Sequence, residues 1–174
     1  PEPGPEMTFK KQLFIPNKRD YITATRKHNG PCIICSIIAE APEVTNLLVW
    51  KNGIVAACAN LYPYNAGHLL LFPIRHIHDP RELEINESSQ LQTLLNKALD
   101  VLDQTYQPAG YNLGYNVGEA SGASIPHLHQ HVVPRYSREL GFVDITAGAK
   151  IIIEDPVVTL EKLKTAFKDF TINP

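Results

Sequence analysis

The chain has 174 residues, a length that suits one compact domain with a substantial core. Its hydrophobic fraction of 44% and charged fraction of 20% are ordinary for a folded, water-soluble protein and exclude disordered, collagen-like and coiled-coil classes. A formal net charge of −2 leaves no electrostatic footprint for long nucleic acid. Any anionic ligand should therefore be small and held by local groups.

Neither a membrane nor an oxidising compartment is indicated. No apolar stretch reaches the ~20 residues that cross a bilayer, and no apolar core of a signal peptide follows the N-terminal charges. Three cysteines do not make a disulfide framework, and reduced thiols fit the cytosol. We expect no membrane partner and a cytoplasmic location. The opening PEPGPEM, residues 1–7, is expected to be a disordered tail or a cloning remnant.

The first predicted elements are strands. In NLLVWKNGIVAACANL, the pair Asn52-Gly53 separates two apolar runs rich in strand formers, which predicts a hairpin with a tight primed turn. After the loop YPYNAG, the segment HLLLFPI predicts a short apolar strand closed by Pro73. Cys58 falls inside a predicted strand, where it should be a small core residue.

A long helix and further strands follow. Between Asn86 and Gln107, apolar residues recur at intervals of three and four, which predicts a helix with one buried stripe. YNLGYNVG then predicts a half-buried strand, AKIIIED another strand, and TLEKLKTAFKDF a terminal helix. Strands, a helix and strands in this order favour an antiparallel α+β sheet over alternating βαβ units.

The segment SIPHLHQHVVPRY carries three histidines at alternate positions, His127, His129 and His131. Pro126 and the valines after the histidines favour an extended chain, in which the three rings lie on one face. A single histidine would more simply be a core or surface residue. Three in register fill a core poorly and disfavour one another's charged forms, so they indicate a functional site.

Two chemistries remain open for these histidines. All three could bind zinc in an open site, where the metal lowers the pKa of a bound water. Alternatively, one imidazole attacks phosphorus while its neighbours fix its tautomer and neutralise the oxyanions, helped by Arg135. The two hypotheses use the same residues, so the histidine segment does not decide between them.

HLHQHVV resembles the His-x-His-x-His-x-x signature of the histidine triad (HIT) superfamily of nucleotide hydrolases and transferases. CIIC, NLYPYNAGHLLLFPIRH and YNVGEASGASIPH extend the resemblance over roughly residues 30–136. GFVDITAGAKIIIEDPVVTLEKLK is similar to the C-terminal extension of the branch with Fhit-like hydrolases and diadenosine tetraphosphate phosphorylases. Gln130 and Ala123 depart from the usual pattern, and IPNKRDYI lacks the Trp of that branch.

The resemblance implies a fold. A five-stranded antiparallel sheet with one main helix would form a core domain over residues 30–137, and dimerisation would complete it. Residues 1–29 would be an N-terminal extension, and residues 138–174 a C-terminal extension with a strand and a helix.

The resemblance also implies roles for particular residues. His129 would be the nucleophile and form a nucleotidyl-imidazole intermediate, with His131 at the phosphate and His68 beside it. Residues that bind the substrate would be Asn60, Asn116, Ser124 and His131. Dinucleoside polyphosphates, diadenosine tetra- or triphosphate above all, would be the substrates. Water as the acceptor gives a hydrolase and inorganic phosphate a phosphorylase, and the sequence leaves both open.

A separate zinc site is the final sequence hypothesis. Cys32 and Cys35 have a two-residue spacing that also occurs in redox motifs, but no thioredoxin-like context surrounds them. The resemblance to zinc-bearing family members adds His76 and His127 and implies a structural Cys2His2 zinc. The alternative for the two cysteines is a pair of buried thiols without zinc. The alternatives for the function of the protein are a hydrolase with zinc on the three histidines and a nucleotide-binding module without catalysis. His78 and His28 are expected on the surface.

Overall fold

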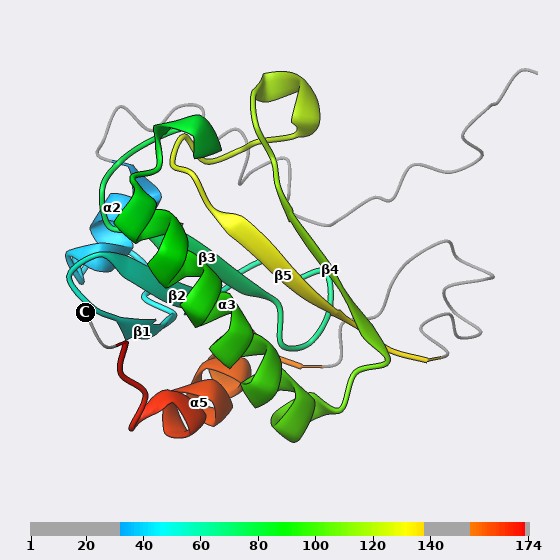
Figure 1. The fold of residues 1–174 in the computed structure, drawn as a ribbon. Coiled ribbons are helices and arrows are strands. Elements are labelled where there is room, and N and C mark those ends of the chain that lie inside the picture. Colours follow the sequence, from blue (N-terminus) through cyan, green and yellow to red (C-terminus); the bar gives the residue numbers. More distant parts are fainter. Residues whose placement is uncertain (1–31, 138–153, 173–174) are drawn as a thin grey trace, which may run out of the picture.

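The computed structural model describes residues 32–137 and 154–172. In these residues, five antiparallel strands form one sheet in the spatial order β1-β2-β3-β5-β4, with helices packed against it (Figure 1). The predicted α+β class and five-stranded antiparallel sheet are confirmed. The elements are α2 (Ile33–Ile38), β1 (Leu48–Lys51), β2 (Val55–Ala59), β3 (Leu69–Pro73), η1 (Pro80–Glu82), α3 (Ile85–Tyr106), β4 (Gly110–Tyr115), η2 (Glu119–Ser121), β5 (Gln130–Arg135) and α5 (Pro156–Phe167).

The predicted hairpin is formed by β1 and β2, but its predicted primed turn is wrong. Neither Asn52 nor Gly53 has the positive φ that such a turn requires. The side-chain oxygen of Asn52 instead accepts from the main-chain N–H groups of Ile54 and Val55, both at 2.8 Å. Because the side chain closes the turn, the backbone keeps ordinary negative φ angles.

The two faces of the sheet bury different sets of side chains. Helix α3, predicted within one residue at each end, crosses one face with α5 against it (Figure 1). Strand residues that point to this face alternate with residues that point to the other, as pleating requires. Buried residues on the α3 face include Val55, Ala57, Leu69, Leu71 and Val132, and those on the opposite face are Ile34, Ala56, Cys58, Leu70 and Phe72.

Strand β4 lies at the edge of the sheet. The predicted half-buried alternation is wrong here, because Asn112, Leu113 and Gly114 are all exposed. Within the described segments β4 pairs only with β5, so its remaining side faces no strand. An edge strand of this kind has unpaired main-chain groups that another chain can meet.

The terminal helix is confirmed, although it begins three residues earlier than expected. Asp155 caps α5 by accepting from the N–H of Val157 at 2.8 Å, and Pro156 occupies the first helical position, where no N–H is needed. Most of the predicted strand AKIIIED lies outside the described residues, as do residues 1–29 and His28.

Gly67 fixes the loop that delivers His68 to the start of β3. Its φ of +79° lies in the left-handed region, and a Cβ there would stand 3.0 Å from Leu102 Cδ2 and 3.2 Å from the ring of Tyr106. Glycine is required for two reasons. It is the residue that adopts this φ without strain, and any side chain here would crowd the residues of α3. The chain therefore turns tightly into β3 and holds His68 at a fixed position.

Replacing Gly67 should weaken the fold and displace His68. We expect Gly67→Ala to lower the free energy of unfolding by about 1–3 kcal/mol, because both φ strain and crowding oppose the added methyl group. Urea unfolding followed by circular dichroism measures this. The control is Gly53→Ala, since φ is not positive there and nothing lies within 4 Å of the added Cβ. Equal losses in both variants would contradict the argument.

Candidate active site and metal centre

Strand pairing brings the predicted site residues to one face of the sheet. His131 lies opposite Leu70 in β3 and opposite Gly114 in β4. Directly paired residues point to the same side of a sheet, and residues two apart in one strand do so as well. His68, two residues before Leu70, and Asn116, two residues after Gly114, therefore lie on the face of His131. This is the face opposite α3.

A chain of hydrogen bonds fixes the tautomers of His68 and His131. The main-chain N–H of Tyr64 donates to Nδ1 of His68 at 3.0 Å, and the amide nitrogen of Asn60 lies 3.2 Å from the same atom. A peptide N–H can only donate, so Nδ1 of His68 is unprotonated and its proton sits on Nε2. That Nε2 lies 3.0 Å from Nδ1 of His131, which accepts the proton.

The same logic places the proton of His131 on Nε2. Because Nδ1 accepts from His68, neutral His131 is a donor at the opposite corner of its ring. The amide nitrogen Nδ2 of Asn116 lies 3.3 Å from this Nε2. Two donors do not bond to each other, so this N–H is satisfied only when the Asn116 amide flips and presents its oxygen. His131 therefore offers a fixed N–H on the same face of the sheet as His68, suited to meet an anionic oxygen.

His129 has the opposite arrangement. Its Nδ1 lies 2.7 Å from the main-chain oxygen of His127, which can only accept, so the proton of His129 sits on Nδ1. Nε2 is then left with a lone pair, and no hydrogen bond from the described residues occupies it. The rings of His129 and His131 are 4.9 Å apart and nearly perpendicular. A nucleophilic nitrogen thus lies beside a hydrogen-bond donor.

Burial keeps these imidazoles neutral. It lowers the pKa of His68 to about 3, with smaller contributions from His131 and His129. It also lowers the pKa of His131 to about 4, where His129 adds to the effect, and it lowers the pKa of His129. Both the donating and the accepting nitrogens derived above require neutral rings. The electrostatics and the hydrogen bonds therefore agree.

The prediction that the three histidines form one ridge within a strand is wrong in part. Strand β5 begins at Gln130, so only His131 lies in regular pairing, whereas His127 and His129 precede it. The N–H of Leu128 donates to the oxygen of Ile77 at 2.6 Å, which ties this segment to the chain beyond β3. The ring of His127 is directed to Cys32 and Cys35, away from the pair formed by His129 and His131.

Cys32, Cys35, His76 and His127 form the predicted metal cluster. One ligand atom from each lies within 4.8 Å of all the others, and in the described segments no other group of three or more His, Cys, Asp or Glu residues does this. Cys35 Sγ lies 3.2 Å from Nδ1 of His76 and 3.6 Å from Nδ1 of His127. A tetrahedral zinc with usual bond lengths needs S···N separations of about 3.6 Å. The residues present fit a metal ion.

The protonation of the cluster also suits a cation. Nε2 of His127 lies 2.9 Å from the carbonyl of Pro73, so it carries the proton and leaves the Nδ1 lone pair for the thiol side. Burial, followed by Cys32, raises the pKa of the Cys35 thiol to about 11. Burial and the neighbouring Cys32 both disfavour a thiolate at Cys35, and a bound divalent cation would reverse that preference.

The remaining predicted residues have clear positions. Ser124 is exposed in the loop between η2 and β5 and makes no hydrogen bond with the described residues. His78 is exposed as expected, but its ring packs edge-on against His76 at 4.9 Å. Two features were not predicted: Tyr64, whose ring stacks on His68, and helix α2, which carries Cys35. Nothing in the segment YPYN predicts that the ring of Tyr64 contacts the ring of His68, four residues later.

The sequence model of the HIT domain family matches residues 41–138. The chain belongs to the HIT family. A relative in Mycobacterium tuberculosis, named AP-4-A phosphorylase, is 34% identical over 149 residues, which cover 82% of this chain and 76% of that protein. A relative in Schizosaccharomyces pombe, named bis(5'-nucleosyl)-tetraphosphatase [asymmetrical], is 28% identical over 102 residues, which cover 59% of this chain and 56% of that protein.

A solved structure shares the fold of this HIT protein. A Zn-bound histidine triad family protein from Mycobacterium smegmatis superposes with a TM-score of 0.64 at 19% identity, covering 79% of this chain and 94% of that one. At this identity the comparison shows the fold alone. The described parts of the chain contain no helix with the length and apolar character needed to span a membrane.

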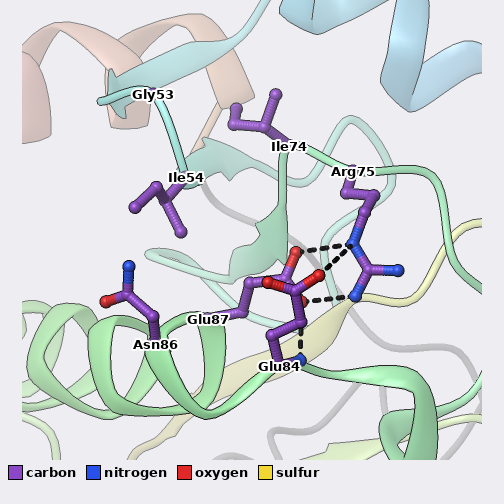
Figure 2. Close-up of a pocket in the computed structure, with 7 residues that line it drawn as sticks. All are labelled: Gly53, Ile54, Ile74, Arg75, Glu84, Asn86 and Glu87. Carbon is purple, nitrogen blue, oxygen red and sulfur yellow. Dashed lines mark hydrogen bonds and ion pairs between the residues drawn. The ribbon is translucent and has the colours of Figure 1, made fainter.

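A pocket lies beyond the C-terminal end of β3, the end opposite His68 (Figure 2). Nε of Arg75 donates to Glu87 Oε1 at 3.0 Å and its Nη2 donates to Oε2 at 2.7 Å, so the guanidinium there is already paired. The ion pair fastens the end of β3 to the first turn of α3. None of the residues that line the pocket is a predicted site residue. They are Gly53, Ile54, Ile74, Arg75, Glu84, Asn86 and Glu87.

Neutral buried histidines predict acid sensitivity. The pKa of His131 is about 4 in the folded chain and near 6.5 when unfolded, so the unfolded state binds more protons between these values. Stability from this residue is complete above about pH 6.5 and is lost as the pH falls towards 4. Urea midpoints measured from pH 7 to pH 4.5 should fall, and less steeply in His131→Asn. Identical slopes in both proteins would refute this.

Proposed function

We propose that the protein transfers or hydrolyses nucleotidyl groups of dinucleoside polyphosphates through a covalent adduct on His129. One observation carries the proposal: the carbonyl of His127 holds the proton of His129 on Nδ1, which leaves Nε2 unprotonated next to the donor of His131. A neutral imidazole is a good nucleophile near pH 7. The names of the tuberculosis and fission yeast relatives support dinucleoside polyphosphates as substrates.

The proposed reaction has two displacements. Nε2 of His129 attacks the phosphorus of one nucleotide, the bond from that phosphorus to the bridging oxygen breaks, and the rest of the substrate leaves. An acceptor then attacks the same phosphorus and breaks the P–N bond, which restores the imidazole. Splitting one difficult displacement into two lowers each barrier. Phosphoryl oxygens carry negative charge, so the N–H of His131 is suited to stabilise them during both steps.

The surrounding residues would bind and position the substrate. Asn60 and Asn116 present side-chain amides beside His68 and His131 and are proposed to contact the phosphate or ribose. Ser124, with an exposed hydroxyl and no bond within the described segments, is proposed to donate to the leaving oxygen. His68 acts on the phosphate through His131, because its own Nε2–H is used in the bond to that ring.

Product analysis tests the reaction and identifies the acceptor. The protein is incubated with diadenosine tetraphosphate, with and without inorganic phosphate, and the nucleotides are separated by chromatography. ADP and ATP that form only with phosphate establish a phosphorylase. AMP and ATP formed without it establish a hydrolase. If neither diadenosine tetraphosphate nor diadenosine triphosphate yields any mononucleotide, the proposal is contradicted. The protein would then be a nucleotide-binding module without catalysis.

Loss of the nucleophile should abolish turnover while the fold remains. We expect His129→Ala to lower kcat by about 10⁴-fold or more, because a covalent route cannot proceed without its nucleophile. Mass spectrometry of acid-quenched parent protein during turnover should detect the nucleotidyl adduct, and the variant should show none. His78→Ala is the matched control, since it removes an exposed histidine that contacts His76 of the metal cluster but none of the catalytic histidines in the described residues. Turnover by His129→Ala at the parent rate would refute the mechanism.

We also propose that Cys32, Cys35, His76 and His127 hold a structural zinc ion. A closed set of two thiolates and two imidazoles is typical of structural zinc, which supplies cross-linking free energy to the fold and no open position for substrate. His127 belongs to this set through Nδ1, which argues against a catalytic metal shared by all three histidines. Reduced thiols as ligands favour a cytoplasmic location.

Removal of the metal should destabilise the protein. One zinc per chain is expected by atomic absorption, and Cys35→Ser should lose it together with about 10 °C of Tm, because the folded state alone binds the ion. Cys58→Ala is the control: it removes the third cysteine, which is buried in β2 and is not a member of the ligand cluster, and should keep the zinc. A full zinc complement in Cys35→Ser would contradict the assignment.

Dimerisation through the edge of the sheet is proposed as well. Family resemblance implies a homodimer, and β4 exposes both its unpaired edge and Leu113, which is 45% accessible. Sedimentation equilibrium should give twice the chain mass of 19.4 kDa. Leu113→Lys should shift the mass towards that of one chain, because buried like charges would meet across the two-fold axis. A monomeric parent protein would refute the proposal.

A further inference from the structure

Tyr64 contacts the hydrogen-bonded pair of His68 and His131, called the histidine relay below, in two ways. Its main-chain N–H donates to Nδ1 of His68 at 3.0 Å. Its phenol ring stacks on the ring of His68, with centroids 5.0 Å apart and planes 24° from parallel, and it lies 6.0 Å from the ring of His131. Both histidines are thus covered by one side chain that is itself 43% exposed.

The main-chain contact controls which atoms of the relay can donate. The N–H of Tyr64 and the side-chain amide of Asn60 both face Nδ1 of His68 as donors, and without them the proton of His68 could reside on either nitrogen. A proton on Nδ1 would leave Nε2 as an acceptor, so that His131 would have to carry its own proton on Nδ1. Nε2 of His131 would then lose the N–H that faces Asn116 and the proposed phosphate.

The ring contact keeps that relay away from water. His68 is 1% exposed, and the phenol ring stacked on it is 43% exposed, so this ring covers part of His68. His131 is partly exposed, with the same ring 6.0 Å away. The titratable groups that face His131 in the described structure are His68 before β3, His129 on its own segment and Tyr64 in the loop. None of these groups is a carboxylate that would stabilise a protonated His68 or His131.

We propose that Tyr64 is a positioning residue for His68 and His131, which sets their tautomers through its main-chain N–H and shields their rings with its phenol. It acts through the two histidines and does not touch the reacting atoms. Its effect on turnover rests on the proposed function, whereas its effect on the rings does not. The aromatic ring and not the hydroxyl group makes the stacking contact with His68, so phenylalanine should replace it, and every variant at this position keeps the main-chain N–H.

Nuclear magnetic resonance of the folded protein, labelled with ¹⁵N in its histidines, measures tautomers and titration directly. In the parent protein, His68 and His131 should both carry the proton on Nε2 at pH 7. In Tyr64→Ala the midpoints of both rings should rise by about one pH unit or more, because water reaches them. Tyr64→Phe should retain the parent values.

Tyr62→Ala is the matched control, because Tyr62 is a neighbouring tyrosine of similar exposure, 37%, and its ring is not among those that contact the two histidines in the described residues. It should leave both midpoints unchanged. Unchanged midpoints in Tyr64→Ala, or equal shifts in Tyr62→Ala, would overturn the proposal. So would a parent protein whose His68 is protonated on Nδ1, a result that needs no variant to fold.

The kinetic arm separates this inference from the proposed function. If diadenosine tetraphosphate is turned over, kcat should fall about tenfold or more in Tyr64→Ala and recover in Tyr64→Phe, because a His68 ring without its stacked partner is less firmly oriented toward His131. Parent kinetics in Tyr64→Ala would overturn the role in turnover. If the parent turns over no dinucleotide, the proposed function fails, while the ring measurements still decide the role of Tyr64.

Discussion

The hydrogen bond between His68 and His131 depends on the register of two strands that are distant in the sequence. Leu70 in β3 pairs with His131 in β5, and this pairing brings the ring that precedes β3 to within 3.0 Å of the ring in β5. A slip of one residue would turn His131 to the face covered by α3. Val132, which is fully buried on the α3 face, opposes that slip because the polar ring of His131 would take its place in the core. Core packing thus protects the geometry of the site.

Fixed main-chain partners, and not charged side chains, determine the protonation of the site. The amide of Tyr64, the carbonyl of His127 and the carbonyl of Pro73 each contact one ring nitrogen of a different histidine. A carbonyl can only accept and a peptide N–H can only donate, so each assigns a tautomer without ambiguity. Burial keeps the rings neutral, and neutral rings are what these partners require. The result is one free lone pair, on His129, beside one N–H, on His131, which faces the amide of Asn116.

His127 connects the metal cluster to the proposed nucleophile. Its ring contacts both cysteines through Nδ1, while its carbonyl accepts from Nδ1 of His129. Movement of its backbone would therefore disturb both the ligand set and the orientation of His129. Alternate residues of one short segment serve separate purposes because His127 lies before the regular strand and can turn its ring to α2, while His131 is held by strand pairing.

Local patterns in the sequence determined much of this protein. The three- and four-residue spacing predicted α3 within one residue of each end, since a stripe of leucines is buried wherever such a helix packs. The alternating histidines predicted the candidate site, and family resemblance implied all four residues of the cluster that could hold a metal ion. The side-chain turn of Asn52, the start of β5 at Gln130 and the exposure of β4 were decided by tertiary structure, because each depends on partners that the local pattern does not contain. The tautomers, and with them the roles of His68, His129 and Tyr64, also required the fold. They follow from which main-chain group faces each ring nitrogen, and only the packed chain fixes that.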